Sequence, residues 1–280
     1  MLNDVVICDP VRTPVGRFGG QFKSLQAHHL GRRVIEGLLE RNPDIAAHVE
    51  EVIFAQCYPT MDAPAVGRVV ALDAGLPEET CGYQLDRRCG SGLQAVINAV
   101  MQVATGGSQM VIAGGAESMS NAPFYSPGAR WGIRGTSLEF HDALAQGRVT
   151  AGGINYPVPG GMLETAENLR ESHEITREAQ DEFAVESHRR AIAAQQDGLF
   201  EDEIIPVTVR DRRKGDQVHT LDEHPRADVS LDKLAGLSPI RIKADPKSTV
   251  TAGNASGQND GASACIVTTR AMADKLGLKA

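Results

Sequence analysis

The sequence predicts an α/β fold, because strand and helix signals alternate along roughly its first 115 residues. Three apolar runs, at residues 5–8, 52–55 and 110–113, have the length and composition of buried strands. Two stretches between them, 25–39 and 93–104, repeat apolar side chains at helical spacing. Strands that alternate with helices usually pair in parallel. We therefore expect a layer of parallel strands with helices packed on it.

Single residues mark the ends of the elements in this first part. Pro10 ends the first strand, and Ser24 is a candidate N-cap for the first helix. A short helix over 65–74 is closed by Gly75, since glycine readily adopts the left-handed conformation that follows a helix. Residues 83–85 are a weak strand candidate, because the run is short and partly polar.

The amino-acid composition and periodicity of the chain change after Gly115. Residues 119–163 are rich in Gly, Pro, Ser and Asn and show little periodicity, which is typical of a functional or a disordered segment. The elements expected beyond it are helices over 165–173, 176–196 and 271–276 and strands over 204–209 and 264–267. We therefore predict a core of residues 1–118 and 249–280, interrupted by an inserted domain over 119–248.

Composition excludes several functional classes. The 280 residues carry a formal net charge of −8, which argues against binding to nucleic acid or to an anionic membrane. No apolar run reaches the roughly 18–20 residues of a membrane helix, and no signal peptide is visible at the N-terminus. Five widely spaced cysteines without a Cys-x-x-Cys pair argue against a disulfide framework or a zinc site. We expect a cytoplasmic protein without a metal.

The segment around Cys89 has the features of a nucleophilic turn. Cys89 lies between a candidate strand and an apolar helix, so its thiol is at a helix N-terminus, where unpaired N–H groups and the helix dipole favour a thiolate. Gly90 and Gly92 allow a tight turn and leave the Cys89 N–H free to donate to an oxyanion. The alternative is a structural cysteine buried in a tight turn.

A second interpretation of the same residues is a dinucleotide-binding fingerprint. Gly90, Gly92 and Ala95 match the pattern G-x-G-x-x-G/A, and Glu117 lies where a ribose-binding carboxylate would be expected. The strand before them argues against this interpretation, because residues 83–88 are largely polar, whereas a central parallel strand is a continuous apolar run. Binding of a nicotinamide dinucleotide would distinguish the two interpretations.

Four segments of the chain are more specific together than any is alone. They are Asp9–Gly20 (DPVRTPVGRFGG), Cys89–Gly92 (CGSG), Gly114–Ser120 (GGAESMS) and Thr251–Ala262 (TAGNASGQNDGA). In this order they resemble the thiolase family, which comprises the acetyl-CoA acetyltransferases and 3-ketoacyl-CoA thiolases. The resemblance extends from about residue 3 to residue 280, which is the whole chain.

The resemblance implies a fold and a set of site residues. The fold would be the N-terminal α/β core of a thiolase, half of a five-layer α/β/α/β/α arrangement, with an inserted loop domain. Cys89 would be the acyl-accepting nucleophile, with its own N–H in the oxyanion hole. The residues implied to contact the substrate, a coenzyme A thioester, are Ala252, Ser256, Gly257, Arg226 and Met162. For Gly257 a turn, and for Met162 a place in a loop core, are the structural alternatives.

The residues with which the family moves protons are missing from this sequence. The family has a histidine in Gly-His-Pro, an asparagine in Asn-Glu-x-Phe and a second cysteine in Cys-x-Gly, and none of these motifs is present. His224 is followed by proline but preceded by Glu223, and Cys265 lies in an apolar run. The chain therefore resembles the N-terminal half of a thiolase. We expect negligible turnover from these residues alone, because a nucleophile and its proton-transfer groups act as a unit.

With the missing half supplied in cis or in trans, the expected function is acyl transfer. Cys89 would take the acyl group of a 3-ketoacyl-CoA and pass it to coenzyme A, or two acyl-CoA molecules would condense in the reverse direction. No metal or redox cofactor is implied. The alternatives are a condensing enzyme similar to β-ketoacyl synthase and a non-catalytic, thiolase-like subunit that binds coenzyme A. The expected assembly is a homodimer or homotetramer, without nucleic acid or membrane partners.

Overall fold

The computed structural model describes residues 2–211, 213 and 215–280. Its internal contacts divide the chain into two compact units. The first consists of Met1–Asn121, Phe200–Glu223 and Asn259–Ala280, and the second of Ala122–Leu199 and His224–Gln258. Both units are therefore assembled from segments that are distant in the sequence.

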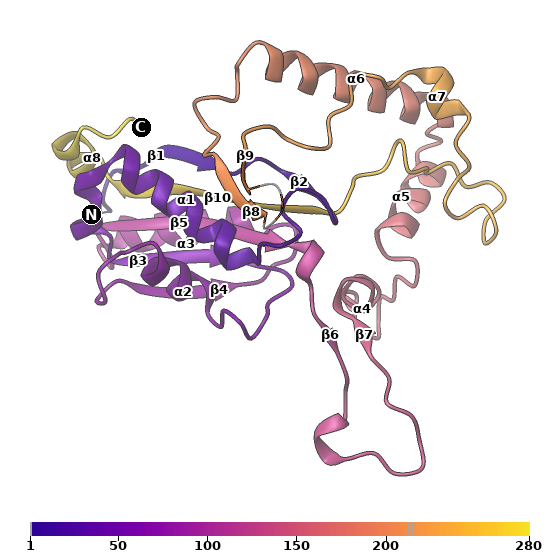
Figure 1. Ribbon diagram of the computed structural model, residues 1–280, viewed down its shortest axis with the longest axis horizontal. Helices are drawn as coiled ribbons and strands as arrows, with labels where there is room; N and C mark the ends of the chain where they lie inside the picture. Colours follow the sequence, from indigo (N-terminus) through magenta and orange to yellow (C-terminus); the bar gives the residue numbers. More distant parts are fainter. Residues whose placement is uncertain (1, 212, 214) are drawn as a thin grey trace. The chain divides into compact units, whose positions relative to one another are not determined.

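A six-stranded sheet lies at the centre of the first unit (Figure 1). Its main path runs in the order β1 (Val5–Arg12), β10 (Asn259–Thr269), β5 (Met110–Ser118), β3 (Glu51–Ala55) and β4 (Cys81–Leu85), and the short β2 (Gly16–Arg17) also pairs with β10. The apolar runs of the sequence correspond to β1, β3 and β5, the weak candidate corresponds to β4, and the run over 264–267 lies within β10.

The strands of this sheet pair in both directions. β3 is parallel to β4 and to β5, as expected for strands joined by helical crossovers. β10 is antiparallel to β1 and to β5, so the expectation of a parallel layer is wrong for this strand. The reason lies in the connection: Asp260 near the start of β10 pairs with Ser118 at the end of β5. The chain re-enters the sheet beside the C-terminal end of β5, where it left, so β10 must run in the opposite direction to β5.

Helices cover both faces of the sheet. α1 (Ala27–Arg41), α2 (Val66–Asp73) and α8 (Arg270–Leu276) pack into one hydrophobic cluster, which includes Phe54 and Ile112. α3 (Ser91–Thr105) packs into a second cluster with Ile53 and Val111. Neighbouring residues of a strand point to opposite faces, so the two clusters lie on opposite sides of the sheet. The predicted α/β fold class is thus confirmed.

The first helix begins later than its candidate cap suggests. α1 has Gln26 as its N-cap, and the Gln26 N–H donates to His29 Nδ1 at 3.1 Å. The N–H of Leu25 still belongs to the preceding turn and donates to the carbonyl of Phe22 at 2.9 Å. The prediction of Ser24 as the N-cap is therefore wrong. A short 3-10 helix, η1 (Pro43–His48), follows α1, and another, η2 (Met119–Asn121), follows β5.

Residues 200–223 belong to the unit that contains the sheet. The Arg12 N–H donates to the Glu203 carbonyl, and the Ile205 N–H donates to the Arg12 carbonyl, each at 2.8 Å. The antiparallel hairpin of β8 (Val207–Asp211) and β9 (Gly215–His219) follows. Burial of Ile205 and Val207 in the first hydrophobic cluster keeps this stretch with the core. The division therefore differs here from the predicted inserted domain over 119–248.

The second unit contains four helices within the described part of the chain: α4 (Ala143–Thr150), α5 (Gly161–Ser172), α6 (Arg177–Gln196) and α7 (Leu231–Ala235). Its short strands β6 (Phe124–Tyr125) and β7 (His141–Asp142) pair around a 3-10 turn, η3 (Ala129–Trp131). Residues 249–258, which we expected in the core, also lie in this unit. Buried Glu167 on α5 accepts the N–H groups of Thr249 and Val250 and so ties the start of this stretch to the second unit. None of the helices described is long and apolar enough to cross a membrane.

Candidate functional site

Cys89 lies in the turn that joins β4 to α3. Both elements are labelled in Figure 1. β4 ends at Leu85, and α3 begins at Ser91 with Gly90 as its N-cap. Cys89 itself is exposed. A cysteine at the start of an apolar helix is what the sequence predicts, and the alternative of a buried structural cysteine does not hold.

The backbone amides of this turn are not all engaged. The N–H groups of Gly90 and Ser91 donate to carbonyls earlier in the turn, at 3.2 and 2.9 Å. Within residues 2–211, 213 and 215–280, the Cys89 N–H makes no hydrogen bond of standard geometry. A Cβ added to Gly92 would meet no atom within 4 Å, so the space beside the start of α3 is open. A free amide next to an open space can stabilise an oxyanion.

The residue before Cys89, Arg88, has a left-handed backbone with φ +52°, which is strained for a residue with a Cβ. Its N–H donates to Asp86 Oδ1 at 2.7 Å, and its carbonyl accepts from the Ser91 hydroxyl at 2.6 Å. Ser91 is buried, and its Oγ also accepts from the Arg87 N–H at 2.6 Å. A network of hydrogen bonds therefore determines the shape of the turn.

A polar cluster around Glu117 contacts this turn. The N–H groups of Cys57 and Tyr58 donate to the two Glu117 carboxylate oxygens at 2.7 and 3.3 Å. The Cys57 carbonyl accepts from Arg88 Nη1 at 2.8 Å, and Cys57 Sγ lies 3.9 Å from Ser91 Oγ. Burial raises the pKa of Glu117, against the opposing effect of the two amide donors. The carboxylate is thus engaged within its own unit, which argues against the ribose-binding role of the dinucleotide interpretation.

Three of the other four cysteines are in environments that keep the thiol protonated. Burial raises the pKa of Cys57 and of Cys265 to about 11, and it also raises the pKa of Cys8. Cys81, on the edge strand β4, is exposed. The residues that the structure describes include no group of three or more His, Cys, Asp or Glu placed to hold a metal ion.

Three of the residues implied to contact coenzyme A lie on one segment of the second unit. Ala252, Ser256 and Gly257 are all exposed on residues 249–258, which form neither a helix nor a strand. In the described part of the chain, the Ser256 hydroxyl has no hydrogen-bond partner and can donate to a ligand. The shape of this segment depends on the side chains that hold its backbone.

Two buried carboxylates provide that support, Glu167 on α5 and Asp181 on α6. Glu167 Oε1 accepts from the N–H groups of Thr249 and Val250 at 2.9 and 2.8 Å. Asp181 Oδ1 accepts from Asn254 Nδ2 at 2.9 Å. Local sequence patterns miss both carboxylates, because they lie 82 and 73 residues before their partners Thr249 and Asn254.

The remaining candidates also lie in the second unit. A Cβ added to Gly257 would collide with the His224 ring, so packing by itself explains why this position has no side chain. Arg226 is exposed, and its N–H donates to His188 Nδ1 at 3.1 Å. Burial, and then the charge of Arg226, lowers the pKa of His188, so a neutral ring accepts this bond. Met162, in the first turn of α5, is 63% exposed and is not a core residue.

Comparison with known proteins identifies the family. The family model described as Thiolase, N-terminal domain, matches residues 5–271. Beta-ketothiolase BktB of Cupriavidus necator is 40% identical over 281 residues, which cover 100% of this chain and 69% of that protein. Acetyl-CoA acetyltransferase of Rhizobium meliloti is 41% identical over 275 residues, which cover 98% and 68%. The crystal structure of the Bacillus anthracis acetyl-CoA acetyltransferase has a TM-score of 0.91 at 41% identity, over 99% of this chain and 68% of that one. The chain therefore belongs to the thiolase family.

Proposed function

We propose that this chain is an acyltransferase of the thiolase type, which carries the acyl group of a coenzyme A thioester on Cys89. The observation that carries the proposal is the exposed Cys89 thiol beside an unpaired amide and an open space at the start of α3. Relatives named beta-ketothiolase and acetyl-CoA acetyltransferase support the same chemistry.

In the degradative direction, the Cys89 thiolate attacks the C3 ketone carbon of a 3-ketoacyl-CoA. The C2–C3 bond breaks, its electron pair passes to C2, and protonation there gives acetyl-CoA, while the acyl group stays on Cys89. The thiolate of a second coenzyme A attacks this thioester and releases the Cys89 thiolate. The Cys89 N–H donates to the oxyanion of each intermediate. The reaction is redox-neutral overall, and we propose no cofactor besides the coenzyme A thioester, which is the substrate.

Coenzyme A is proposed to bind along residues 249–258 of the second unit. Ser256 supplies an unpartnered hydroxyl, and Ala252 and Gly257 supply exposed backbone. Arg226 supplies a guanidinium for phosphate oxygens, and exposed Met162 supplies apolar surface for an acyl chain. The buried carboxylates Glu167 and Asp181 support this site because they hold the segment in one shape.

Complete turnover is proposed to need a second thiolase segment, in the same polypeptide or in a partner chain. Protonation of C2 requires groups that the thiolase resemblance assigns to motifs absent from these 280 residues. The alignments cover 69% and 68% of the named relatives. In addition, α3 presents an apolar stripe at helical spacing, in which Leu93 and Met101 are 69% and 61% exposed. A stripe of this kind is typical of a surface that packs against another element.

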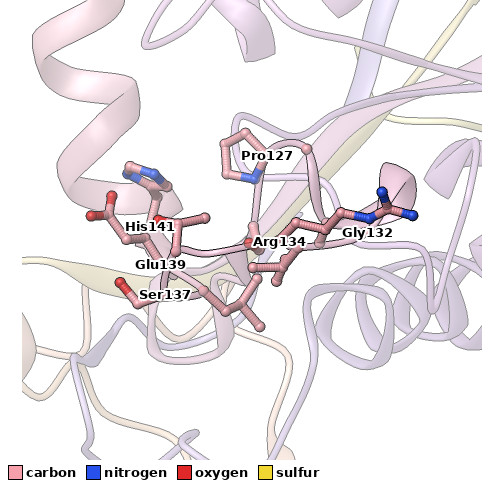
Figure 2. Close-up of a pocket in the computed structure, with 12 residues that line it drawn as sticks. Pro127, Gly132, Arg134, Ser137, Glu139 and His141 are labelled. Carbon is pink, nitrogen blue, oxygen red and sulfur yellow. The ribbon is translucent and has the colours of Figure 1, made fainter.

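A homo-oligomer is the proposed assembly. Residues 124–142 form an arm whose two ends pair as β6 and β7. Its exposed aromatic side chains include Trp131, which is 88% exposed, and Phe140, which is 64% exposed. Residues of this arm line a hollow of about 500 Å³. Figure 2 shows its lining residues, among them Pro127 and His141. Exposed aromatic residues concentrated on one short segment are typical of a protein interface.

Intact-mass spectrometry with peptide mapping tests the proposed function. The chain is exposed briefly to acetoacetyl-CoA, with Cys89→Ala as the matched control. We expect an acyl adduct confined to Cys89 and absent from the control, together with little steady-state thiolysis by the chain alone. A coupled thiolysis assay with a rate near that of a full-length thiolase would show that no second segment is needed.

The second candidate function is a non-catalytic subunit that binds coenzyme A, favoured by the absence of the proton-transfer motifs. Under this alternative, coenzyme A binds and no adduct forms on Cys89, even when a full-length thiolase is added as a source of the second segment.

A further inference from the structure

A continuous chain of hydrogen bonds links the central sheet to the nucleophile turn. Glu117 on β5 accepts the N–H groups of Cys57 and Tyr58 on its two oxygens. The Cys57 carbonyl accepts from the Arg88 guanidinium at 2.8 Å, and Arg88 directly precedes Cys89. The acyl-transfer steps described above assign no role to Glu117 or Arg88.

The backbone of Arg88 determines where the nucleophile points. The peptide bond after Arg88 is planar, so the Arg88 dihedral angles set the direction of the Cys89 N–H and, together with the φ and χ1 angles of Cys89, that of its side chain. A left-handed backbone is unfavourable at a residue with a Cβ and persists only where surrounding contacts enforce it. Here its N–H and its carbonyl are bonded within the turn, and its guanidinium is bonded to Cys57 and lies 5.8 Å from the centre of the Tyr58 ring.

We propose that Arg88 and Glu117 are positioning residues for Cys89, which act through the backbone of the segment Cys57–Tyr58. The inference rests on the proposed function, because it concerns the acylation of this thiol. Glu117 fixes the segment, the segment fixes the Arg88 side chain, and Arg88 holds the turn in the geometry that exposes the Cys89 amide and thiol. Neither residue touches the substrate in this role.

The role of Arg88 depends on geometry, and the chain offers a matched control for its charge. Arg87 carries the same charge one residue further from Cys89, but its guanidinium donates to Gln94 on α3 and makes no hydrogen bond to Cys57 within the described residues. Arg88→Gln and Arg87→Gln therefore each remove one positive charge near the thiol, and only the first removes the bond to the Cys57 carbonyl.

The test measures the rate of Cys89 acylation by acetoacetyl-CoA, followed by intact mass in the 280-residue chain. We expect Arg88→Gln to be about tenfold slower and Arg87→Gln to change by less than about threefold, since a tenfold loss needs only about 1.4 kcal/mol. Arg88→Lys should recover most of the rate, because its ammonium can still donate to the Cys57 carbonyl. Equal losses in the two glutamine variants would overturn the proposal, since they would show an effect of charge alone.

A double-mutant cycle tests the link to Glu117. If both residues act through one chain of contacts, the double variant Glu117→Gln/Arg88→Gln should be no slower than Arg88→Gln. Additive losses would contradict the link. Arg88→Gly controls for folding, because glycine adopts a positive φ without strain. It should acylate as slowly as Arg88→Gln while its urea midpoint stays equal to or above that of the wild type, and a wild-type rate in this variant would contradict the proposal.

Labelling by iodoacetamide separates this inference from the proposed function. Peptide mapping measures the rate at which Cys89 is alkylated, with no coenzyme A present. If the wild type is alkylated at Cys89 but is not acylated by acetoacetyl-CoA, the proposed function fails. The alkylation rates of the variants then still test the positioning roles. Slower alkylation in Arg88→Gln than in Arg87→Gln supports the proposal, and equal rates overturn it.

Discussion

At the scale of single residues, Cys89 and Cys57 show how strongly the surroundings of two thiols can differ within one chain. Cys89 is exposed at the start of a helix. Burial, and then the neighbouring Glu117, raises the pKa of Cys57 to about 11, so roughly one Cys57 thiol in ten thousand is ionised at pH 7. Of these two thiols, Cys89 is therefore the accessible one, with open space beside it at Gly92. Its glycine neighbours reveal it in the sequence, whereas nothing near Cys57 reveals that this thiol is protonated.

The pH dependence of stability should change in a defined direction in Glu117→Gln. Burial raises the pKa of Glu117 above its value in the unfolded chain, about 4.3, so in the window between the two values the native state binds more protons than the unfolded state. The Glu117 contribution to stability therefore declines as the pH rises through this window. The free energy of unfolding of the wild type, minus that of the variant, should fall and then level off.

Urea denaturation of both proteins at a series of pH values from about 4 upward measures this difference. The contributions of the other titrating groups to the free energy of unfolding are the same in both proteins and cancel. A difference that stays constant, or that grows with pH, would contradict the raised pKa of Glu117.

At the scale of elements, α5 and α6 act as supports for a segment that has no regular structure of its own. Glu167 and Asp181 reach from these helices to the backbone and to Asn254 of residues 249–258. In the Asn-Ala-Ser-Gly motif, the asparagine side chain therefore holds the loop through Asp181, while the serine is exposed. This difference between two neighbouring residues is visible only when the helices are in place.

Loss of the Glu167 carboxylate should weaken both the fold and the binding of coenzyme A. Glu167→Ala leaves the buried N–H of Val250 and the part-buried N–H of Thr249 without partners, so we expect the free energy of unfolding to fall by about 2–4 kcal/mol. The matched control is Glu171→Ala on the same helix, an exposed position where we expect a change of no more than about 0.5 kcal/mol. Urea denaturation and calorimetric titration with coenzyme A measure the two effects.

The same pair of variants can reject the supporting role. Coenzyme A affinity that is equal in Glu167→Ala and Glu171→Ala, under conditions where both proteins are folded, would show that the carboxylate does not shape the binding segment.

At the scale of the whole molecule, the exposed aromatic residues of the arm predict how copies associate. Trp131→Ser should shift the protein to a smaller assembly, because it removes the most exposed large apolar side chain of the arm. Tyr156→Ser is the control, since Tyr156 is 79% exposed in the same unit but lies outside the arm. Sedimentation velocity over a range of concentrations measures the assembly. Identical distributions for Trp131→Ser and the wild type would exclude the arm as an interface.

Local patterns predict much of the first unit, because the burial of a strand or a helix face leaves a short-range signature. The apolar runs of β3 and β5 and the helical stripe of α3 are examples. Such patterns say nothing about the direction of β10, which follows from its pairing with Ser118. They also misplace residues 200–223 and 249–258, because apolar burial and a buried carboxylate far away in the sequence decide which unit each stretch joins.

By itself, the sequence determined the α/β class, the place of Cys89 at the start of a helix, and the resemblance to the thiolases. These features depend on residues close together in the chain or on motifs in a given order. Only the tertiary structure decided that Glu117 reaches Arg88 through Cys57, or that Glu167 holds residues 249–250. The physical reason is that these hydrogen bonds join groups 31 to 83 residues apart, and they exist only after folding has brought the groups within 3 Å.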